Sequence, residues 1–197
     1  IARVMMERVM AVADPASWHL VATDAGLPLY EAFGFIRTGK IVRYQGNVAD
    51  VRSSGDACWG STSDLAAVIR LDKAASGMDR AAMYSALSKE ARIAVLRRSD
   101  GIVGHAFVRD FGRGRVVGPV VASSVGAAQS LISFIMSEDA GALLRVDTGV
   151  HTGLGAWLER NGLSADTAGG IVMQAGTVAS RPAGPVSVFA LAAQALG

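Results

Sequence analysis

The sequence predicts an α/β protein whose sheet mixes parallel and antiparallel strands. Short apolar runs, bounded by glycine or polar residues, alternate along the chain with segments of helical periodicity. Residues 92–122 contain three strand-like runs separated by Ser99-Asp-Gly101 and Gly112-Arg-Gly114, which favour tight turns and predict an antiparallel meander. A helix and another strand follow the meander. This order is typical of a sheet covered by helices.

Residues 1–13 form the first predicted helix. Apolar side chains recur at the i, i+3, i+4, i+8 and i+11 positions of one helical face: Ile1, Val4, Met5, Val9 and Val12. We expect this face to be buried. The helix has no start signal, so we also expect the sequence to be a fragment whose upstream residues are absent.

The next stretch predicts a strand, a short helix and a second strand. The apolar run within residues 18–23 favours a buried strand, and Pro28 suits the first turn of a helix at 27–33. Gly34 stands where a left-handed residue ends such a helix. Residues 35–48 then form strand material. So compact a succession is typical of the closing half of an α/β unit.

The stretch contains Ala22-Thr23 followed, after a short gap, by Leu29-Tyr-Glu-Ala-Phe-Gly-Phe35. These residues resemble the end of a GCN5-related N-acetyltransferase, the GNAT superfamily, which typically carries Ala-Thr, a short gap, and then Leu-Tyr-Glu-x-x-Gly-Phe. The predicted elements from residue 59 onward, α-α-β-β-β-α-β-α-β-β, are also similar to the family order, with closing strands at 170–174 and 186–191. The resemblance therefore implies a GNAT-like fold.

The resemblance also implies a tandem arrangement. Residues 1–50 are expected to be the C-terminal half of a first GNAT-like domain. Residues 51–63 are Gly/Ser-rich and polar, which predicts a linker with a short strand at 57–59. Residues 64–197 are expected to form a second, complete domain.

The second unit resembles one particular domain, the YitH type, which commonly follows a standard acetyltransferase domain. The residues that carry this likeness are Gly77-Met-Asp-Arg80 and Arg115–Ala122. Residues 157–163 occupy in this unit the slot that residues 29–35 occupy in the first.

Charge and cysteine content exclude several classes of protein. The formal net charge is only +2 and like charges are not clustered, so we expect no nucleic-acid partner. Cys58 is the only cysteine, so neither an internal disulfide nor a thiolate zinc site can form. The histidines lack metal-ligand spacing, so no metal site is expected. A single cysteine fits a reducing compartment, and we expect a cytoplasmic location.

Residues 116–137 carry no charge and are long enough to span a bilayer. However, this segment contains Gly118, Pro119 and several serines. A strand followed by a buried helix, capped by Ser123 or Ser124, explains it better. We therefore expect no membrane partner.

The GNAT resemblance implies acetyl-CoA as the acyl donor. Two parallel strands that splay apart expose an edge with which the amide-bearing pantetheine arm can pair, and the next helix start favours the pyrophosphate. In the second unit the arm-binding strand is expected at 118–122. The turn that follows lacks the family's Gln/Arg-x-x-Gly-x-Gly/Ala pattern, so an ordinary capped helix remains an alternative. The residues expected to contact the cofactor are Ile1, Ala2, Arg3, Val120, Val121, Ala122, Ser123, Ser124, Gly126 and Ala127.

Two residues are candidates for catalysis. Tyr30 matches the family tyrosine that often protonates the departing thiolate; the alternative is that its ring only packs. The equivalent position in the second unit is Leu158, which cannot donate a proton. Asp147 ends the strand that should splay, so it could bind the substrate ammonium or accept its proton, or simply form a turn.

His105 and Arg109 fall on one face of the middle strand of the meander, with Phe107 between them. This face could reach a substrate pocket or face solvent. Trp157 is expected in the core.

Together these features predict an N-acetyltransferase that transfers an acetyl group from acetyl-CoA to a primary amine of a small molecule or peptide by direct attack. The chemistry is expected in the first unit. The alternative is that the second domain is a non-catalytic, ligand-sensing module. The strand at 18–23 has no visible neighbour on one side, so another chain or an absent segment must cover it, and a homodimer is possible.

Overall fold

The computed structural model describes residues 1–12, 17–53, 55–99, 101–177 and 184–195, and its elements follow the predicted alternation. Residue 13, the end of the first predicted helix, lies outside the described residues. Residues 1–50 provide α1 (Ala2–Val12), β1 (Ser17–Ala22), α2 (Leu27–Ala32) and β2 (Ile36–Asn47). The later elements are β3 (Ala57–Trp59), α3 (Leu65–Ser76), α4 (Ala81–Leu87), β4 (Arg92–Arg98), β5 (Gly101–Phe111), β6 (Gly114–Ala122), α5 (Val125–Glu138), β7 (Leu143–Gly149), α6 (Gly155–Arg160), β8 (Ser164–Gly176) and β9 (Ser187–Ala190).

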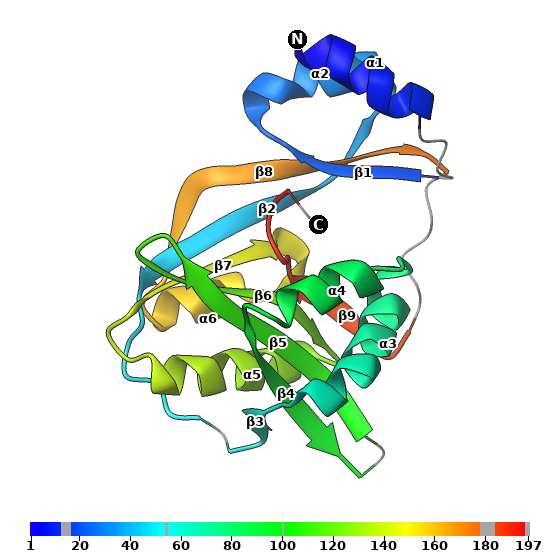
Figure 1. Ribbon diagram of the computed structural model, residues 1–197. Coiled ribbons are helices and arrows are strands. Elements are labelled where there is room, and N and C mark those ends of the chain that lie inside the picture. The colour runs from blue at the N-terminus through cyan, green and yellow to red at the C-terminus, as the bar shows by residue number, and fades with distance from the viewer. Residues whose placement is uncertain (13–16, 54, 100, 178–183, 196–197) are drawn as a thin grey trace.

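The strands form one mixed sheet in the order β1-β8-β2-β7-β6-β5-β4-β3, with β9 paired to β6 (Figure 1). The β6–β7 pair is parallel, and the other pairs among the described residues are antiparallel. The predicted α/β class with a mixed sheet is confirmed.

The two halves of the chain interleave in this sheet. β2 pairs with β7 along one edge and with β8 along the other, and β8 in turn lies between β1 and β2. The division of the chain into two GNAT-like domains joined by a linker at 51–63 stays a prediction. In space, residues 1–50 and 64–197 alternate as neighbours in a single sheet.

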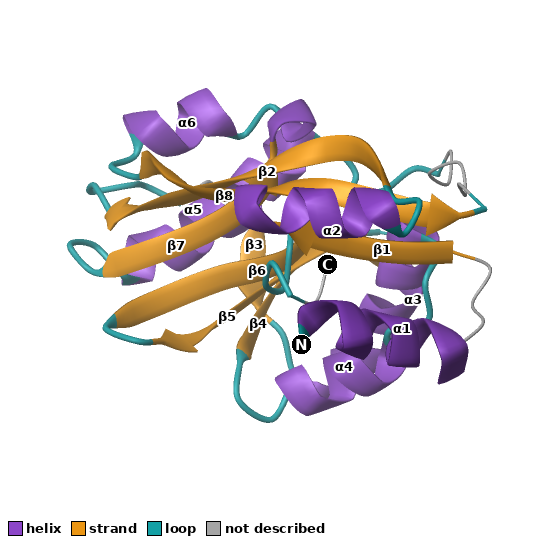
Figure 2. Ribbon diagram, turned by 90° about the horizontal axis from the view of Figure 1, so that it is seen from above, coloured by secondary structure: helices purple, strands orange, loops and turns teal. Residues whose placement is uncertain are grey.

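Helices cover both faces of the sheet. α5 and α6 lie on one face, and α3 and α4 lie on the other (Figure 2). The largest apolar core packs under α5 and α6 around Leu131 and Leu158, and a second packs under α3 and α4 around Val68 and Phe107. α1 and α2 cover a smaller core around Met173.

Residues 116–137 form a strand and a helix, as the sequence predicts. They supply most of β6 and almost all of α5. The Ser124 side chain accepts a hydrogen bond from the Ala127 amide at 3.1 Å, so Ser124 is the cap. In the described part of the chain, no helix combines the length and apolar character that crossing a bilayer requires.

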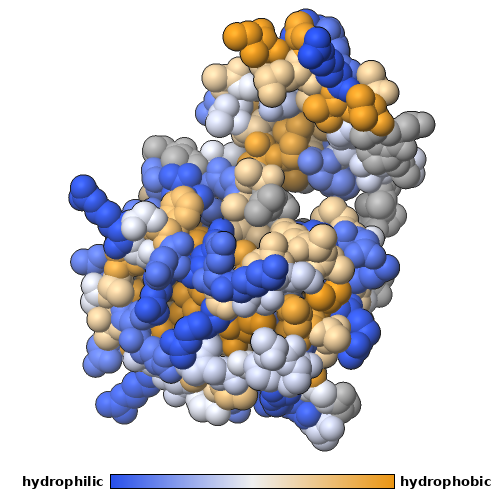
Figure 3. Space-filling model, viewed as in Figure 1, coloured by the Kyte–Doolittle hydropathy of each residue, from blue (hydrophilic) through white to orange (hydrophobic). Residues whose placement is uncertain are grey.

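The predicted orientation of α1 is wrong. Val4, Met5 and Val9 are at least half exposed in the structure, and Ile1 and Val12 are almost fully exposed. The helix instead turns Met6 and Met10 toward the small core. Apolar residues occupy both sides of α1, so periodicity alone selected the wrong side. Apolar side chains accordingly gather on the α1 end of the molecule in Figure 3.

Candidate functional site

Tyr30 lies in the middle of α2 and is half-buried. Its ring meets the edge of Phe35 at a centroid distance of 5.8 Å, and a Cβ on Gly26 would lie 3.1 Å from the ring. Glycine at position 26 thus lets the turn before α2 approach the tyrosine. The Tyr30 ring therefore packs, and within the described residues no hydrogen bond holds its hydroxyl, so the arrangement is compatible with both predicted roles, packing and proton donation.

The start of α1 lies beside α2. The Arg3 guanidinium stands over the Phe33 ring at 5.5 Å from its centroid. Ile1, Ala2 and Arg3 are exposed. The structure therefore brings the first turn of α1 and the helix that carries Tyr30 to the same end of the molecule (Figure 1).

The predicted pair of diverging strands is β6 and β7. They pair in parallel only where Arg115, Val116 and Val117 face Leu144, Arg145 and Val146. Beyond this point the strands separate, and we call the gap between them the fork.

The expectation that the β6 edge is free in the fork is wrong. Val120, Val121 and Ala122 are completely buried, and their backbones pair with β9. The segment at 187–190 thus takes the place that the sequence suggested for a pantetheine arm.

The turn after β6 forms an ordinary capped helix start. Ser123, Ser124 and Gly126 are exposed, Ala127 is half-buried, and a Cβ on Gly126 would make only an ordinary contact of 3.9 Å with the Ser124 hydroxyl. Small side chains leave this turn accessible, yet the strand edge that leads to it is closed by β9.

Asp147 is buried and held by arginines. Arg145 donates from Nε to both carboxylate oxygens at 3.1 Å, and Nε of Arg43 lies 3.8 Å from one of them. The Gln194 amide donates at 3.4 Å. Because two guanidinium groups already balance this carboxylate, the arrangement does not favour a free base or an ammonium site.

His105 and Arg109 share a face, as predicted, but this face is not solvated at His105. α3 and α4 cover it, and His105 packs among the rings of Tyr84 and Phe107 with no exposed surface. Burial lowers the pKa of His105 to about 4, so its imidazole is neutral near pH 7.

Arg109 fastens the C-terminal segment. Its guanidinium donates to the carbonyl of Gly118 at 3.2 Å and to that of Ala192 at 2.8 Å. Burial is the largest cause that lowers the pKa of Arg109, and the charge of Arg145 acts in the same direction.

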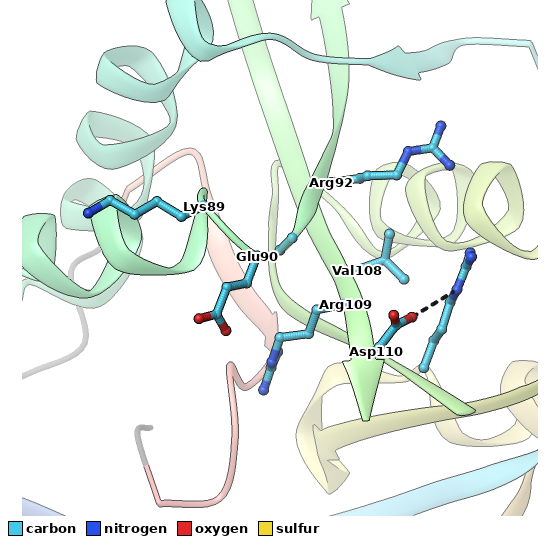
Figure 4. A pocket seen from close by; sticks show the side chains of 8 residues that line it. Lys89, Glu90, Arg92, Val108, Arg109 and Asp110 are labelled. Carbon is cyan, nitrogen blue, oxygen red and sulfur yellow. Dashed lines mark ion pairs between the residues drawn. The ribbon is translucent and has the colours of Figure 1, made fainter. Parts of the chain in front are cut away.

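A shallow cavity of about 330 Å³ lies beside Arg109, where the start of β4 meets the end of β5 (Figure 4). Figure 4 shows Glu90 and Arg109 pointing to the same side, whereas Lys89 and Arg92 point away from each other. Asp110 forms an ion pair with Arg115 at 3.6 Å. The residues that line the cavity are Lys89, Glu90, Ala91, Arg92, Val108, Arg109, Asp110 and Arg115.

Sequence reasoning missed the arginine partners of Asp147 and the buried Asp72–Arg80 ion pair. Arg43 faces Asp147 directly across the β2–β7 ladder, so only knowledge of the strand pairing could have connected them. Arg80 and Asp72 lie on either side of a helix break, and their opposite charges were the available signal.

Comparison with known proteins identifies the domain. A family model described as an acetyltransferase (GNAT) domain matches residues 68–182, more than half of the chain. Among curated protein sequences, none matches this one.

Solved structures share the fold. A candidate acetyltransferase from Pyrococcus horikoshii superposes with a TM-score of 0.80 at 20% identity, covering 100% of this chain and 66% of that one. A GCN5-related N-acetyltransferase from Sphaerobacter thermophilus gives 0.57 at 17%, with coverages of 86% and 64%. One from Kribbella flavida gives 0.57 at 18%, with coverages of 88% and 46%. The chain thus spans 66% or less of the length of these neighbours.

Proposed function

Because this chain belongs to the GNAT acetyltransferase family, we propose that it transfers an acetyl group from acetyl-CoA to a primary amine of a small molecule or peptide. The observation that carries this proposal is the position of Tyr30. It lies on the helix beside the first turn of α1, and its hydroxyl makes no hydrogen bond to another described residue.

The proposed reaction is a direct attack. The neutral amine nitrogen forms a bond to the thioester carbonyl carbon, and the carbon–sulfur bond breaks. The thiolate leaves with the electron pair and takes the Tyr30 proton, while the nitrogen gives up its extra proton to solvent. General acid catalysis of this kind typically contributes about 10²- to 10⁴-fold.

The first turn of α1 supports the proposal by its charge. Arg3 supplies a cation there, and the turn contains no acidic residue that would repel a pyrophosphate. The exposed Ile1, Ala2 and Arg3 are therefore proposed to approach the pyrophosphate of acetyl-CoA.

The test replaces Tyr30 by phenylalanine. We expect kcat for acetylation of the best amine in a broad panel to fall about 100-fold or more, with KM for acetyl-CoA changed less than about threefold. Tyr44→Phe is the matched control. Tyr44 packs against the largest core near α6, away from α2, so loss of its hydroxyl should not affect a reaction at Tyr30. Full activity in Tyr30→Phe would exclude the proton-donor role, and acetylation of no amine would contradict the proposal itself.

A second candidate function concerns the second unit alone: a non-catalytic, ligand-sensing module. Leu158, at the position equivalent to Tyr30, is fully buried in the core and offers no proton. The cavity beside Glu90 and Arg109 presents a carboxylate and a guanidinium group, which could bind a small polar molecule. Calorimetry on the whole chain should then give heat with a small metabolite that Glu90→Gln removes, while acetylation by the same variant is unchanged.

We also propose a cytoplasmic protein, because its one cysteine, Cys58, is free and a reducing compartment keeps such a thiol unmodified. A homodimer is proposed from the edge of β1, which pairs on one side with β8 and has no partner strand on the other among the described residues. Light scattering of the purified chain tests it, and a monomer at micromolar concentration would contradict it.

A further inference from the structure

The fork between β6 and β7 is a place where an extended ligand could add itself to the sheet, and the chain itself occupies it. β6 and β7 stop pairing after Val117 and Val146. Beyond them β9 runs antiparallel to β6, with Ala190, Val188 and Ser187 opposite Val120, Val121 and Ala122. On the β6 side of the fork, the strand edge is therefore already paired with β9.

Residues 187–192 are also hydrogen-bonded to β7, on the other side of the fork. The Leu191 amide donates to the Asp147 carbonyl at 2.9 Å, and the Thr148 hydroxyl donates to the Phe189 carbonyl at 2.6 Å. The Arg109 guanidinium holds the Ala192 carbonyl at 2.8 Å. Residues 187–192 thus bond to β5, β6 and β7 at once.

The fork is shaped to receive this segment. Gly118 has φ = +154°, and a Cβ at this position would lie 2.0 Å from the Leu191 carbonyl oxygen. Ala190 and Ala192 are at most 1% exposed and Phe189 is 8% exposed. Part of the segment therefore belongs to the core, because these three side chains are buried while Ser187, Val188 and Leu191 are half-buried.

We infer that the second unit takes no acetyl-CoA, because residues 187–192 hold the place of the carrier's arm. The binding site for acetyl-CoA then lies in the first unit, next to α1 and Tyr30. This inference rests on the proposed function, and it limits the chain to one acetyl-CoA site. The second unit then serves as the frame that holds β2 between β7 and β8.

Competition between the arm and β9 favours β9. A tethered strand acts at an effective concentration of about millimolar or more, whereas a free carrier acts at its own concentration. An entering arm could replace ladder hydrogen bonds with its amides. It would still expose Phe189, Ala190 and Ala192 and leave the buried partners of residues 189–192 unsatisfied.

Hydrogen exchange on the intact chain, with and without millimolar coenzyme A, tests the inference. We expect peptides covering residues 117–122 and 186–192 to exchange slowly at the same rate in both samples. A change of more than about threefold in either peptide, whether faster through displacement of β9 or slower through added protection, overturns it.

The outcome separates this inference from the proposed function. If the chain acetylates amines and these peptides are unaffected, both hold. If the chain is inactive and the peptides are unaffected, the inference holds and the function fails. If coenzyme A alters the peptides, the inference fails whether or not the chain is active.

Two charge variants give an independent readout. Val125 is 39% exposed at the first residue of α5, where an acidic side chain is compatible with the helix dipole. Val125→Glu is expected to change the affinity for coenzyme A less than about twofold. Arg3→Glu, the matched change at α1, is expected to weaken it about tenfold or more. A tenfold loss in Val125→Glu overturns the inference.

Discussion

At the scale of single residues, the Asp72–Arg80 pair is the clearest case of a buried charge that needs its partner. Side-chain exposure is 1% for Asp72 and 8% for Arg80, and the Arg80 Nε lies 3.0 Å from the carboxylate. The pair joins the end of α3 to the start of α4. Taking both charges out of water is unfavourable, so the pair stabilises the fold only while both members are present.

Arg80→Met is therefore expected to lower the free energy of unfolding by about 3–5 kcal/mol, because it leaves the Asp72 carboxylate buried without its cation. Urea denaturation measures this change. The double variant Asp72→Leu with Arg80→Met should recover most of the loss, since both buried charges are then gone. A single variant that loses less than about 1 kcal/mol would show that water reaches Asp72.

His105 makes stability depend on pH. Its pKa in the folded protein is lowered to about 4 from an ordinary value of 6.5, mainly by burial, with Asp72 raising it and Arg80 lowering it. The unfolded chain therefore binds a proton between pH 6.5 and 4 that the folded chain does not. The stability contributed by neutral His105 is complete above about pH 6.5 and decreases as the pH falls through this window, by up to about 1.4 kcal/mol per pH unit.

His105→Met should flatten this part of the profile, and the difference from the unmodified chain isolates the histidine from carboxylates that titrate in the same range. His19→Gln is the matched control for removal of a histidine, because the His19 side chain is exposed. Unfolding free energies from urea titrations at pH 7, 6, 5 and 4 supply the comparison. Equal slopes for His105→Met and the unmodified chain would contradict the assignment.

At the scale of elements, Gly118 decides whether β6 and the C-terminal segment can approach each other. Gly118→Ala is expected to destabilise the protein by about 2–4 kcal/mol, because a Cβ would meet the Leu191 carbonyl and the backbone angle suits only glycine. Gly126→Ala is the matched change at the start of α5, where a Cβ would make only an ordinary contact of 3.9 Å with the Ser124 hydroxyl and φ is not positive. It should be neutral or stabilise by up to about 1 kcal/mol. Thermal unfolding of both variants checks the pair, and equal effects would exclude the close approach.

Most elements could be predicted from the sequence because local chemistry sets them. Gly34 and Gly77 adopt the positive φ that ends a helix, and Ser124 caps α5. The pattern at 29–35 also revealed the family, which the match to residues 68–182 establishes independently.

Which elements pair or pack with one another could not be predicted in the same way. β8 begins at Ser164 rather than 170, since its polar first residues gain strand structure only by pairing with β2. α1 carries apolar residues on two sides, so its buried side depends on the core that Met6 and Met10 meet. The partners of Asp147 and the occupant of the fork likewise depend on contacts between distant residues.

At the scale of the whole molecule, the interleaved strands make the two halves of the chain one folding unit. β2 has partners on both edges, β7 and β8, and both belong to the second half. β8 also pairs with β1, so strands from the two halves alternate across one end of the sheet (Figure 1). The same sheet therefore positions both Tyr30 and the fork, although they lie in different halves of the sequence.

Removing residues 1–50 is accordingly expected to prevent folding of the remainder. It leaves β8 without β1 and β2, and it exposes the edge of β7 that β2 covers. Removing residues 1–12 is the matched truncation, because it takes away α1 and its contacts from Met6 and Met10 but leaves every described strand paired. Circular dichroism and thermal melts should show a cooperative, less stable fold for the short truncation and none for the long one. A cooperative melt from residues 51–197 within a few degrees of the intact chain would mean that the second unit folds alone.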